Sequence, residues 1–190
     1  MFLSKNKIQL QRAVFFDRDD TLIENVPYNG DPEKVKLIVG ARDALEALQH
    51  AGFLLFVVSN QSGVARGLIT AEDVERVNQR MLELLGKNFF QAIYNSYALP
   101  NDPKDVTRKP SPYFLKLAAD EYSLDLSHSW LIGDRAADVE CAKNAGCRAV
   151  LLPSDQDDPA ERKRAERKTD LKAGSILEAA QWVLREADQN

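Results

Sequence analysis

Short apolar runs alternate with longer amphipathic stretches along this chain. Continuous apolar runs suit strands that are covered on both faces, and they predict strands at residues 13–16, 53–58, 92–97, 130–132 and 149–152. Stretches with helical spacing predict helices at residues 40–51, 70–85, 111–122, 137–145 and 174–187. This alternation is typical of an α/β fold, so we expect a Rossmann-like, three-layer α/β/α arrangement with a mostly parallel sheet.

Residues that suit helix ends mark several of these boundaries. Thr70 is expected to be an N-cap, because the acidic Asp73 follows three positions later. Ser111 precedes a proline, which favours a helix start. Gly146 stands where the helix before it would need a left-handed residue to end.

Residues 155–170 form the most polar part of the chain. Two adjacent aspartates and a proline come first, followed by a run in which lysine and arginine are mixed with glutamate. Because both charge signs are present, we expect a solvated loop and helix. A basic docking patch is the alternative, which the interspersed glutamates disfavour.

Length, charge and hydropathy limit the classes of protein to consider. The 190 residues suit a single domain over 1–190, and the hydrophobic 44% suffice for one core. A net charge of −4 disfavours a dedicated nucleic-acid-binding protein. The apolar runs are shorter than the ~20 residues that cross a bilayer, and no secretory leader is expected. We therefore expect a cytoplasmic monomer that binds neither membrane nor nucleic acid.

Two aspartates follow the first expected strand. In parallel α/β sheets the carboxyl ends of the strands form the ligand-binding edge. An extended chain would place the Asp17 and Asp19 carboxylates on one face, opposite Arg18 and Asp20. Two carboxylates so placed repel each other unless a cation lies between them, and a hard ion such as Mg²⁺ suits oxygen ligands. An Asp-rich turn that caps a neighbouring helix is the alternative.

Hydroxyl and amide side chains follow the second strand. Ser59, Asn60 and Gln61 stand there, with Gly63 close behind. Hydroxyl and backbone N–H donors at a strand end can hold a phosphate group. A hydrogen-bonded turn without a ligand is the alternative.

Charged residues complete the candidate site. Arg108 and Lys109 are adjacent cations that could neutralise a phosphate, although two exposed basic residues would give the same pattern. Asp134 leaves the tip of the fourth strand, where a metal ligand could meet Asp17. Asp138 lies in the first turn of the next helix, where it could orient a ligand or cap the helix.

Together these motifs resemble those of the haloacid dehalogenase (HAD) superfamily of aspartate-nucleophile phosphohydrolases. They are Asp-x-Asp-x-Thr at 17–21, the serine at 59, the lysine at 109 and Gly-Asp-x-x-x-Asp at 133–138. Asp-Arg-Asp-x-Thr-Leu, Asn-Gln-Ser-Gly-x-Ala-Arg-Gly and Arg-Lys-Pro are similar to one branch in particular. That branch contains the D-glycero-D-manno-heptose 1,7-bisphosphate and histidinol-phosphate phosphatases. The resemblance covers roughly residues 12–153.

The resemblance implies a catalytic role for four residues. Asp17 would be the nucleophile that becomes an aspartyl phosphate, and Asp19 would be the general acid and then the general base. Ser59 would donate to the phosphoryl group. Lys109 would neutralise charge on both the phosphoryl group and Asp17.

The resemblance also implies a metal site and a substrate site. Mg²⁺ would be held by the carboxylates of Asp17 and Asp134 and the backbone carbonyl of Asp19, with Asp138 in support. The substrate would be contacted by Asn25, Tyr28, Asn60, Gln61, Arg108 and Arg135.

Two features bear on the substrate. The segments between the motifs are filled by the expected elements, so we expect a capless HAD fold with an open site. Phosphatases of this branch usually carry a zinc loop of cysteines and a histidine before Arg-Lys-Pro, but residues 98–107 contain neither, so no zinc is expected.

Cys141 and Cys147 are expected to be buried packing residues. Asp20 stands where phosphatases of this family often have glycine. Aspartate tolerates unusual backbone angles better than most residues, so we expect the turn to be kept.

These observations favour a Mg²⁺-dependent phosphatase that acts on a small phosphorylated metabolite. D-glycero-D-manno-heptose 1,7-bisphosphate, hydrolysed at its 7-phosphate, is the first expectation, and histidinol phosphate is the alternative. A phosphatase of nucleic-acid ends is disfavoured by the negative net charge. A non-catalytic phosphate-binding module is the alternative of another class, and the presence of Asp17, Asp19, Lys109 and Asp134 counts against it.

Overall fold

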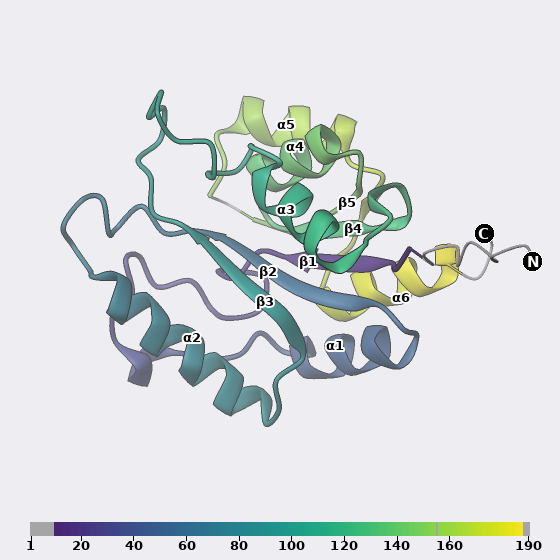
Figure 1. Cartoon of the computed structure of the whole chain (residues 1–190), viewed down its shortest axis with the longest axis horizontal. Helices are drawn as coiled ribbons and strands as arrows, with labels where there is room; N and C mark the ends of the chain where they lie inside the picture. Colours follow the sequence, from purple (N-terminus) through teal and green to yellow (C-terminus); the bar gives the residue numbers. More distant parts are fainter. Residues whose placement is uncertain (1–9, 155, 188–190) are drawn as a thin grey trace, which may run out of the picture.

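A six-stranded sheet forms the centre of the computed structural model, which describes residues 10–154 and 156–187. The strands lie in the order β3-β2-β1-β4-β5-β6, and each neighbouring pair is parallel (Figure 1). Their bounds are β1 (Ala13–Phe16), β2 (Leu54–Asn60), β3 (Phe90–Ser96), β4 (Trp130–Gly133), β5 (Arg148–Leu151) and β6 (Leu171–Lys172). The parallel sheet expected from the sequence is therefore confirmed.

Helices cover both faces of this sheet (Figure 1). One layer consists of α1 (Ala41–His50), α2 (Ala71–Leu85) and α6 (Ile176–Ala187). The opposite layer consists of α3 (Tyr113–Tyr122), α4 (Ala136–Ala145) and α5 (Pro159–Lys168). Two short 3-10 helices, η1 (Pro32–Lys34) and η2 (Leu126–His128), lie in the connections. The three-layer α/β/α architecture is as expected.

Burial on both faces of the sheet explains the apolar runs. In β1, Val14 and Phe16 pack in the core formed with α1, α2 and α6, whereas Ala13 and Phe15 pack in the core formed with α3, α4 and α5. All four are 0% exposed. Full burial of a large apolar side chain stabilises a fold by about 1.5–3 kcal/mol, so a polar residue on either face of β1 would be costly.

Most of the expected helix ends are confirmed. Thr70 and Asp73 form a capping box, in which each side chain accepts a hydrogen bond from the other residue's backbone. Gly146 ends α4 with φ +83°, a left-handed angle that glycine adopts without strain. The helix expected from Ser111 begins at Tyr113 instead, although the Ser111 hydroxyl still accepts a hydrogen bond from the Tyr113 N–H at 3.3 Å.

Two sheet elements differ from the sequence-based expectation. β3 begins at Phe90 rather than at residue 92, and Phe89 and Phe90 are both buried. β6 was not expected, because a strand of 2 residues leaves no pattern in a sequence.

The carboxyl ends of the central strands form the edge of the sheet that is suited to ligand binding. β1 lies between β2 and β4, so the strand order reverses beside it, and open α/β sheets bind ligands at such a reversal. The segments that follow β1, β2 and β4 meet at this edge. Short connections fill the described chain between the motifs, which agrees with the capless fold. No described helix is both long and apolar enough to cross a membrane.

Candidate active site

A cavity of about 480 Å³ opens where β1, β2 and β4 end. All the side chains expected at the site line it except Ser59: Asp17, Asp19, Asn25, Tyr28, Asn60, Gln61, Arg108, Lys109, Asp134, Arg135 and Asp138. These residues come from distant parts of the sequence, and the parallel sheet brings them together.

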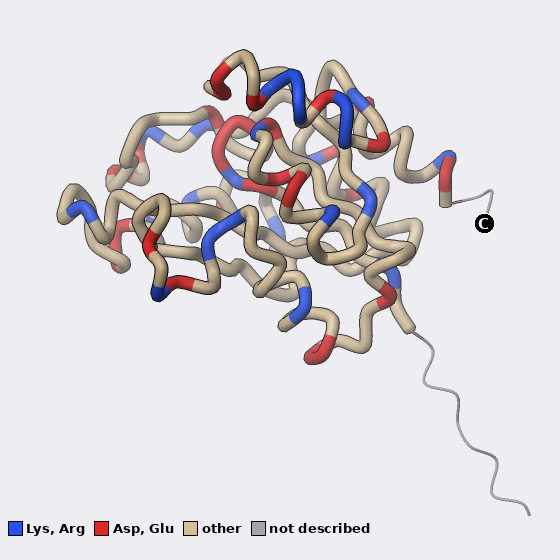
Figure 2. Tube along the Cα trace, turned by 90° about the horizontal axis from the view of Figure 1, so that it is seen from above, with Lys and Arg blue, Asp and Glu red and all other residues tan. Residues whose placement is uncertain are grey.

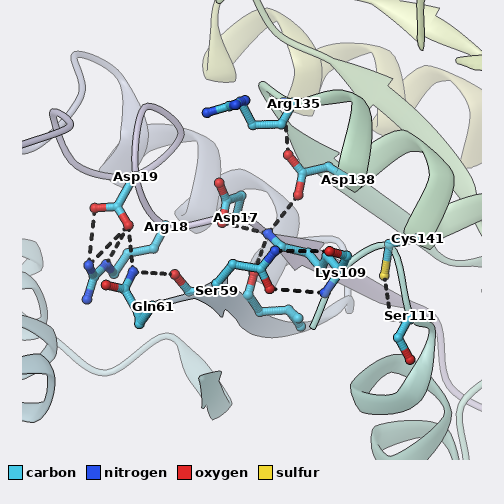
Figure 3. Close-up of polar contacts among 12 residues, drawn as sticks. Asp17, Arg18, Asp19, Ser59, Gln61, Lys109, Ser111, Arg135, Asp138 and Cys141 are labelled. Atoms are coloured by element: carbon cyan, nitrogen blue, oxygen red, sulfur yellow. Dashed lines mark hydrogen bonds and ion pairs between the residues drawn. The ribbon is translucent and has the colours of Figure 1, made fainter. Parts of the chain in front are cut away.

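A buried lysine joins two of the expected carboxylates (Figure 3). The Lys109 Nζ atom lies 2.6 Å from Asp17 Oδ1 and 2.6 Å from Asp138 Oδ1. It also donates a hydrogen bond to the Val58 carbonyl at 2.7 Å. Burial opposes the charge on Lys109, but Asp138 and Asp17 outweigh this effect and raise its pKa. Lys109 is therefore a fixed positive charge beside Asp17.

Three carboxylates form a group that could hold a metal ion. Oxygen atoms of Asp17, Asp134 and Asp138 lie within 4.8 Å of one another, and all three residues are buried. Asp134 Oδ2 accepts a hydrogen bond from Ser154 at 2.8 Å, whereas Asp134 Oδ1 is buried without a hydrogen-bond partner. A buried oxygen without a partner is costly, and a hard cation would satisfy it with the ligand type it prefers.

The pKa values describe the same need for positive charge. Burial, together with the negative charges of Asp17 and Asp138, raises the pKa of Asp134 to about 8. Burial also raises the pKa of Asp138 to about 6, although the charge of Lys109 opposes that rise. A divalent cation among these carboxylates would favour their ionised forms.

The contacts of Asp138 determine the backbone and the residue type beside Asp134. Asp138 Oδ2 accepts a hydrogen bond from the Arg135 N–H at 2.9 Å, which caps the start of α4. A Cβ atom on Gly133 would lie only 2.4 Å from the Asp138 carboxyl group. Position 133 therefore requires glycine. Asp138 caps the helix, which confirms one of the two roles considered for it, and it also forms an ion pair with Lys109.

Asp17 and Asp19 both line the cavity, but Arg18 does not point away from Asp19 as expected. β1 ends at Phe16, so the side chains beyond it do not alternate as in a strand. The Asp19 carboxylate lies 3.0 Å from the buried Arg18 guanidinium and accepts a hydrogen bond from Gln61 at 2.7 Å (Figure 3). Asp20 has φ +56°, so aspartate does adopt the left-handed angle at this turn.

Ser59 and Gln61 are hydrogen-bonded to each other, and of the two only Gln61 lines the cavity. Ser59 is 1% exposed, and its Oγ accepts a hydrogen bond from Gln61 Nε2 at 2.7 Å. The same Gln61 nitrogen donates to Asp19 Oδ2. Gln61 thus links the end of β2 to the turn after β1, which sequence spacing did not predict.

Asn60 fixes the backbone of Lys109. Its Nδ2 donates to the Lys109 carbonyl at 3.1 Å, and its Oδ1 accepts from the Lys109 N–H at 3.0 Å. The side chain expected to contact substrate therefore also positions the lysine.

The loop after β1 forms one wall of the cavity. Asn25 is held by a hydrogen bond from its N–H to Asp20 Oδ1 at 3.2 Å. Tyr28 is 47% exposed and packs over Gly63, where an added Cβ would approach the Tyr28 ring to 2.9 Å. Gly63 is thus required for the close contact between these two loops.

Arginines gather at the mouth of the cavity. Burial lowers the pKa of Arg108, and the positive charges of Arg66 and Arg135 lower it further. Asp105 opposes this lowering, and an anion in the cavity would oppose it as well. The pKa of Arg135 is raised despite its burial, because Asp157 pairs with it. Arg66 belongs to the Asn-Gln-Ser-Gly-x-Ala-Arg-Gly motif, but its spacing in the sequence did not indicate a role at the site.

Residues 155–170 do more than form a solvated helix. Asp157 accepts hydrogen bonds from Arg135 Nε at 2.9 Å and from the Ala136 N–H at 2.8 Å. Glu161 and Arg164 of α5 line the cavity. Arg162 donates to the Asp134 carbonyl at 2.8 Å. These contacts join distant segments, so a sequence pattern could not reveal them; residue 155 lies outside the described residues.

The two cysteines are packing residues, as expected. Cys141 is 0% exposed and Cys147 is 3% exposed. Cys141 Sγ contacts the Ser111 carbonyl at 3.1 Å (Figure 3). Burial raises the pKa of each thiol to about 12, so neither is a thiolate near neutral pH.

The parallel sheet carries an aspartate–lysine pair and a group of carboxylates at its binding edge, which suits the hydrolysis of phosphoric monoesters, and similar proteins identify the chain as a phosphatase. Residues 106–179 match the family model described as HAD-hydrolase-like. The chain belongs to the HAD-like hydrolase family, as the following relatives establish.

The chain is 35% identical over 155 residues to a D-glycero-D-manno-heptose-1,7-bisphosphate 7-phosphatase of Chlorobaculum tepidum, covering 74% of this chain and 78% of that protein. It is 30% identical over 182 residues to a D-glycero-beta-D-manno-heptose-1,7-bisphosphate 7-phosphatase of Haemophilus ducreyi, covering 91% and 98%. It is also 34% identical to a bifunctional protein of histidine biosynthesis from Legionella pneumophila, with 72% of this chain matching 40% of that protein.

A solved structure has the same fold. A D,D-heptose 1,7-bisphosphate phosphatase from B. bronchiseptica, complexed with magnesium and phosphate, superposes with a TM-score of 0.80 at 24% identity. The match covers 93% of this chain and 100% of that chain.

Proposed function

We propose that this phosphatase removes the 7-phosphate of D-glycero-D-manno-heptose 1,7-bisphosphate, with Mg²⁺, through an aspartyl phosphate on Asp17. The observation that carries the proposal is the position of Lys109, 2.6 Å from Asp17, a carboxylate that is grouped with Asp134 and its buried oxygen without a hydrogen-bond partner. The relatives with 35% and 30% identity are named for this substrate.

Asp17 acts as the nucleophile in the first step. A carboxylate oxygen of Asp17 attacks phosphorus, and the bond between phosphorus and the sugar oxygen breaks. Lys109 holds Asp17 in place and offsets the negative charge of both reactants, which otherwise repel each other. Phosphoryl transfer depends mainly on this positioning and charge stabilisation, because little covalent chemistry is asked of the protein.

Asp19 transfers the protons. It gives a proton to the departing sugar oxygen, and as a carboxylate it then takes a proton from water. That water attacks phosphorus, the bond to Asp17 breaks, and inorganic phosphate leaves. Arg18 and Gln61 hold the Asp19 carboxylate at the wall of the cavity.

The carboxylate group fits a Mg²⁺ ion. Asp17 and Asp134 would hold it with their side chains, the Asp19 carbonyl would add a backbone ligand, and Asp138 would support the site. When bound, the ion supplies positive charge that draws the phosphoryl oxygens toward Asp17 and stabilises the transition state. We propose no zinc, and residues 98–107 offer no cysteine or histidine for it.

The arginines at the cavity mouth favour a substrate with a second anionic group. Arg108 and Arg135 line the cavity, and Arg66 adds positive charge nearby. The second phosphate of a heptose bisphosphate would be attracted there, whereas the ammonium group of histidinol phosphate would be repelled. Histidinol phosphate remains the second candidate because of the similarity to the histidine-biosynthesis protein.

We further propose that the whole chain acts as one domain and as a monomer, on a small cytoplasmic metabolite rather than on nucleic acid. One sheet with two helical layers unites its described elements. Positive and negative residues are interspersed along the described chain (Figure 2), and the net charge of −4 disfavours nucleic acid as a partner.

Phosphate release from both candidate substrates tests the proposal. The assay compares heptose 1,7-bisphosphate, histidinol phosphate and an aryl phosphate, each with and without Mg²⁺, and uses Asp17→Asn as the control. The proposal expects Mg²⁺-dependent release that is fastest from the bisphosphate and lost in Asp17→Asn. Faster release from histidinol phosphate would overturn the substrate, and full activity of Asp17→Asn would overturn the mechanism.

A further inference from the structure

The loop between β3 and α3 is ordered by its own side chains. Residues 97–112 connect the two elements and carry Arg108 to the cavity. Within this loop, Asp102 accepts a hydrogen bond from the Lys104 N–H at 3.0 Å. Asp105 makes a larger set of contacts, and these lead directly to Arg108.

Asp105 contacts both residues that follow Val106. Its Oδ1 accepts hydrogen bonds from the Thr107 N–H at 3.1 Å and from the Thr107 hydroxyl at 2.6 Å. Its Oδ2 accepts one from the Arg108 N–H at 2.8 Å. Hydrogen bonds to a carboxylate are stronger than those between neutral groups. One side chain thus fixes the backbone at two successive residues.

The fixed segment is also attached to the sheet. The Thr107 hydroxyl lies 2.9 Å from the hydroxyl of Ser96, which is 1% exposed at the end of β3. Because β3 fixes the position of Ser96, this contact attaches the segment that Asp105 holds to the sheet.

The head group of Arg108 is directed by the same loop. Its Nη1 donates to the Ala98 carbonyl at 3.3 Å, so the arginine closes the loop on itself. Arg66 and Arg135 repel the Arg108 charge, whereas Asp105 attracts it. Without Asp105, a long side chain would remain near two other cations with less to hold it toward the cavity.

We propose that Asp105 is a positioning residue that presents Arg108 to the part of the substrate far from the reacting phosphate. Asp105 sets the affinity for a second anionic group and leaves the bond-breaking step to Asp17 and Lys109. This inference rests on the proposed function, because it takes Arg108 as a substrate contact.

Kinetics of four variants test this role: Asp105→Ala, Asp105→Asn, Arg108→Ala and the Asp105→Ala/Arg108→Ala double variant. Asp102→Ala is the matched control, because it removes an aspartate side chain from the same loop that does not contact Arg108. The substrates are heptose 1,7-bisphosphate and p-nitrophenyl phosphate, which has no distal anion. Melting temperatures show whether each variant is folded.

Asp105→Ala is expected to raise the KM for the bisphosphate about tenfold, as for loss of a charge-assisted hydrogen bond, with little change in kcat. Its kcat/KM for the bisphosphate, divided by that for p-nitrophenyl phosphate, should fall by a similar factor. Asp105→Asn keeps the size of the side chain and should give a smaller loss. The double variant should be no worse than Arg108→Ala, because both changes remove the same contact.

Different failures have different meanings. If Arg108→Ala raises KM but Asp105→Ala behaves like Asp102→Ala, the positioning role is overturned and the proposed function stands. If Asp105→Ala impairs both substrates equally, Asp105 only maintains the loop, and the inference is also overturned. If Arg108→Ala leaves the KM for the bisphosphate unchanged, the substrate contact in the proposed function fails, and this inference fails with it.

Discussion

The side-chain amide of Asn60 makes hydrogen bonds with both backbone groups of Lys109, at 3.1 Å to the carbonyl and 3.0 Å from the N–H. The end of β2 therefore holds the residue whose Nζ atom lies 2.6 Å from Asp17. The lysine is positioned by its main chain as well as by its buried ammonium group.

Removal of this contact should slow the reaction more than it weakens the fold. In Asn60→Ala, Lys109 loses both backbone partners, and a misplacement of about 1 Å costs up to about 100-fold in rate. We expect kcat for an aryl phosphate to fall about 10- to 100-fold. Asn95→Ala is the control, because the buried Oδ1 of Asn95 has no hydrogen-bond partner. Equal kcat values for Asn60→Ala and the native protein would contradict this role.

Binding of Mg²⁺ should stabilise the protein through Asp134. At roughly 100 times its Kd, a ligand that binds only the folded state stabilises it by about 2.7 kcal/mol. We expect the melting temperature to rise with added Mg²⁺ and to be insensitive to it in Asp134→Asn. A rise of the same size in both proteins, measured by differential scanning calorimetry, would place the ion elsewhere.

The effect of Mg²⁺ should depend on pH in a defined direction. The pKa of Asp134 is raised from 3.8 to about 8, chiefly by burial. Without metal, the free energy of unfolding should therefore fall as the pH rises from about 4 to about 8. The ion requires the ionised form, so protons compete with it at low pH. The melting-temperature rise on adding Mg²⁺ should be larger at about pH 8 than at about pH 6. The reverse order would contradict the raised pKa.

Gly133→Ala should damage both stability and activity. The new methyl group would lie 2.4 Å from the Asp138 carboxyl group, which is tied to Lys109 and to the Arg135 N–H. Overpacking of a buried site costs about 1–3 kcal/mol, and displacement of Asp138 would release Lys109. Gly146→Ala is the comparison, because its Cβ would meet nothing within 4 Å. That variant should lose about 1 kcal/mol in urea unfolding yet retain its kcat.

Cys141 and Cys147 should resist alkylation in the native protein. Burial raises the pKa of both thiols to about 12, and the thiolate is the reactive form. We expect mass spectrometry to find no iodoacetamide adducts at about pH 8 in the folded protein and two adducts after unfolding in urea. Rapid labelling of Cys141 in the folded protein would show that the α4 face is not packed as described.

The sequence predicted the sheet because burial determines it locally. Val14 and Phe16 face one helical layer and Phe15 the other, so an uninterrupted apolar run was required. Asp17 and Asp134 were found as site candidates for a related reason: each directly follows such a run. Parallel strands then bring these ends together without further information.

Other parts of the site depend on contacts that spacing does not encode. The ion pair between Arg18 and Asp19 was not predicted, because β1 ends at Phe16 and strand alternation gives no guide to the residues after it. The link between Asp157 and Arg135 joins residues from separate loops, and the polarity of residues 155–170 suggested only solvent exposure. The hydrogen bonds of Asn60 to Lys109 likewise appear only once β2 and the loop before α3 are in place.

The proposed mechanism requires Asp17 to carry the phosphoryl group during turnover. Asp19→Asn should allow this intermediate to accumulate, because the variant lacks the base that activates water for its hydrolysis. An aryl phosphate serves as substrate, since its leaving group departs without a proton from Asp19. Borohydride reduces an acyl phosphate to an alcohol, which would convert the residue at position 17 to homoserine.

Peptide mass spectrometry after borohydride treatment of Asp19→Asn, mixed with aryl phosphate and Mg²⁺, is therefore the most direct measurement. If Asp17 is the nucleophile, homoserine will form at position 17 alone, and only when both substrate and Mg²⁺ are present. Modification at Asp134 or Asp138 instead of Asp17 would contradict the proposed mechanism. Sustained phosphate release by the single variant Asp17→Asn would contradict it as well.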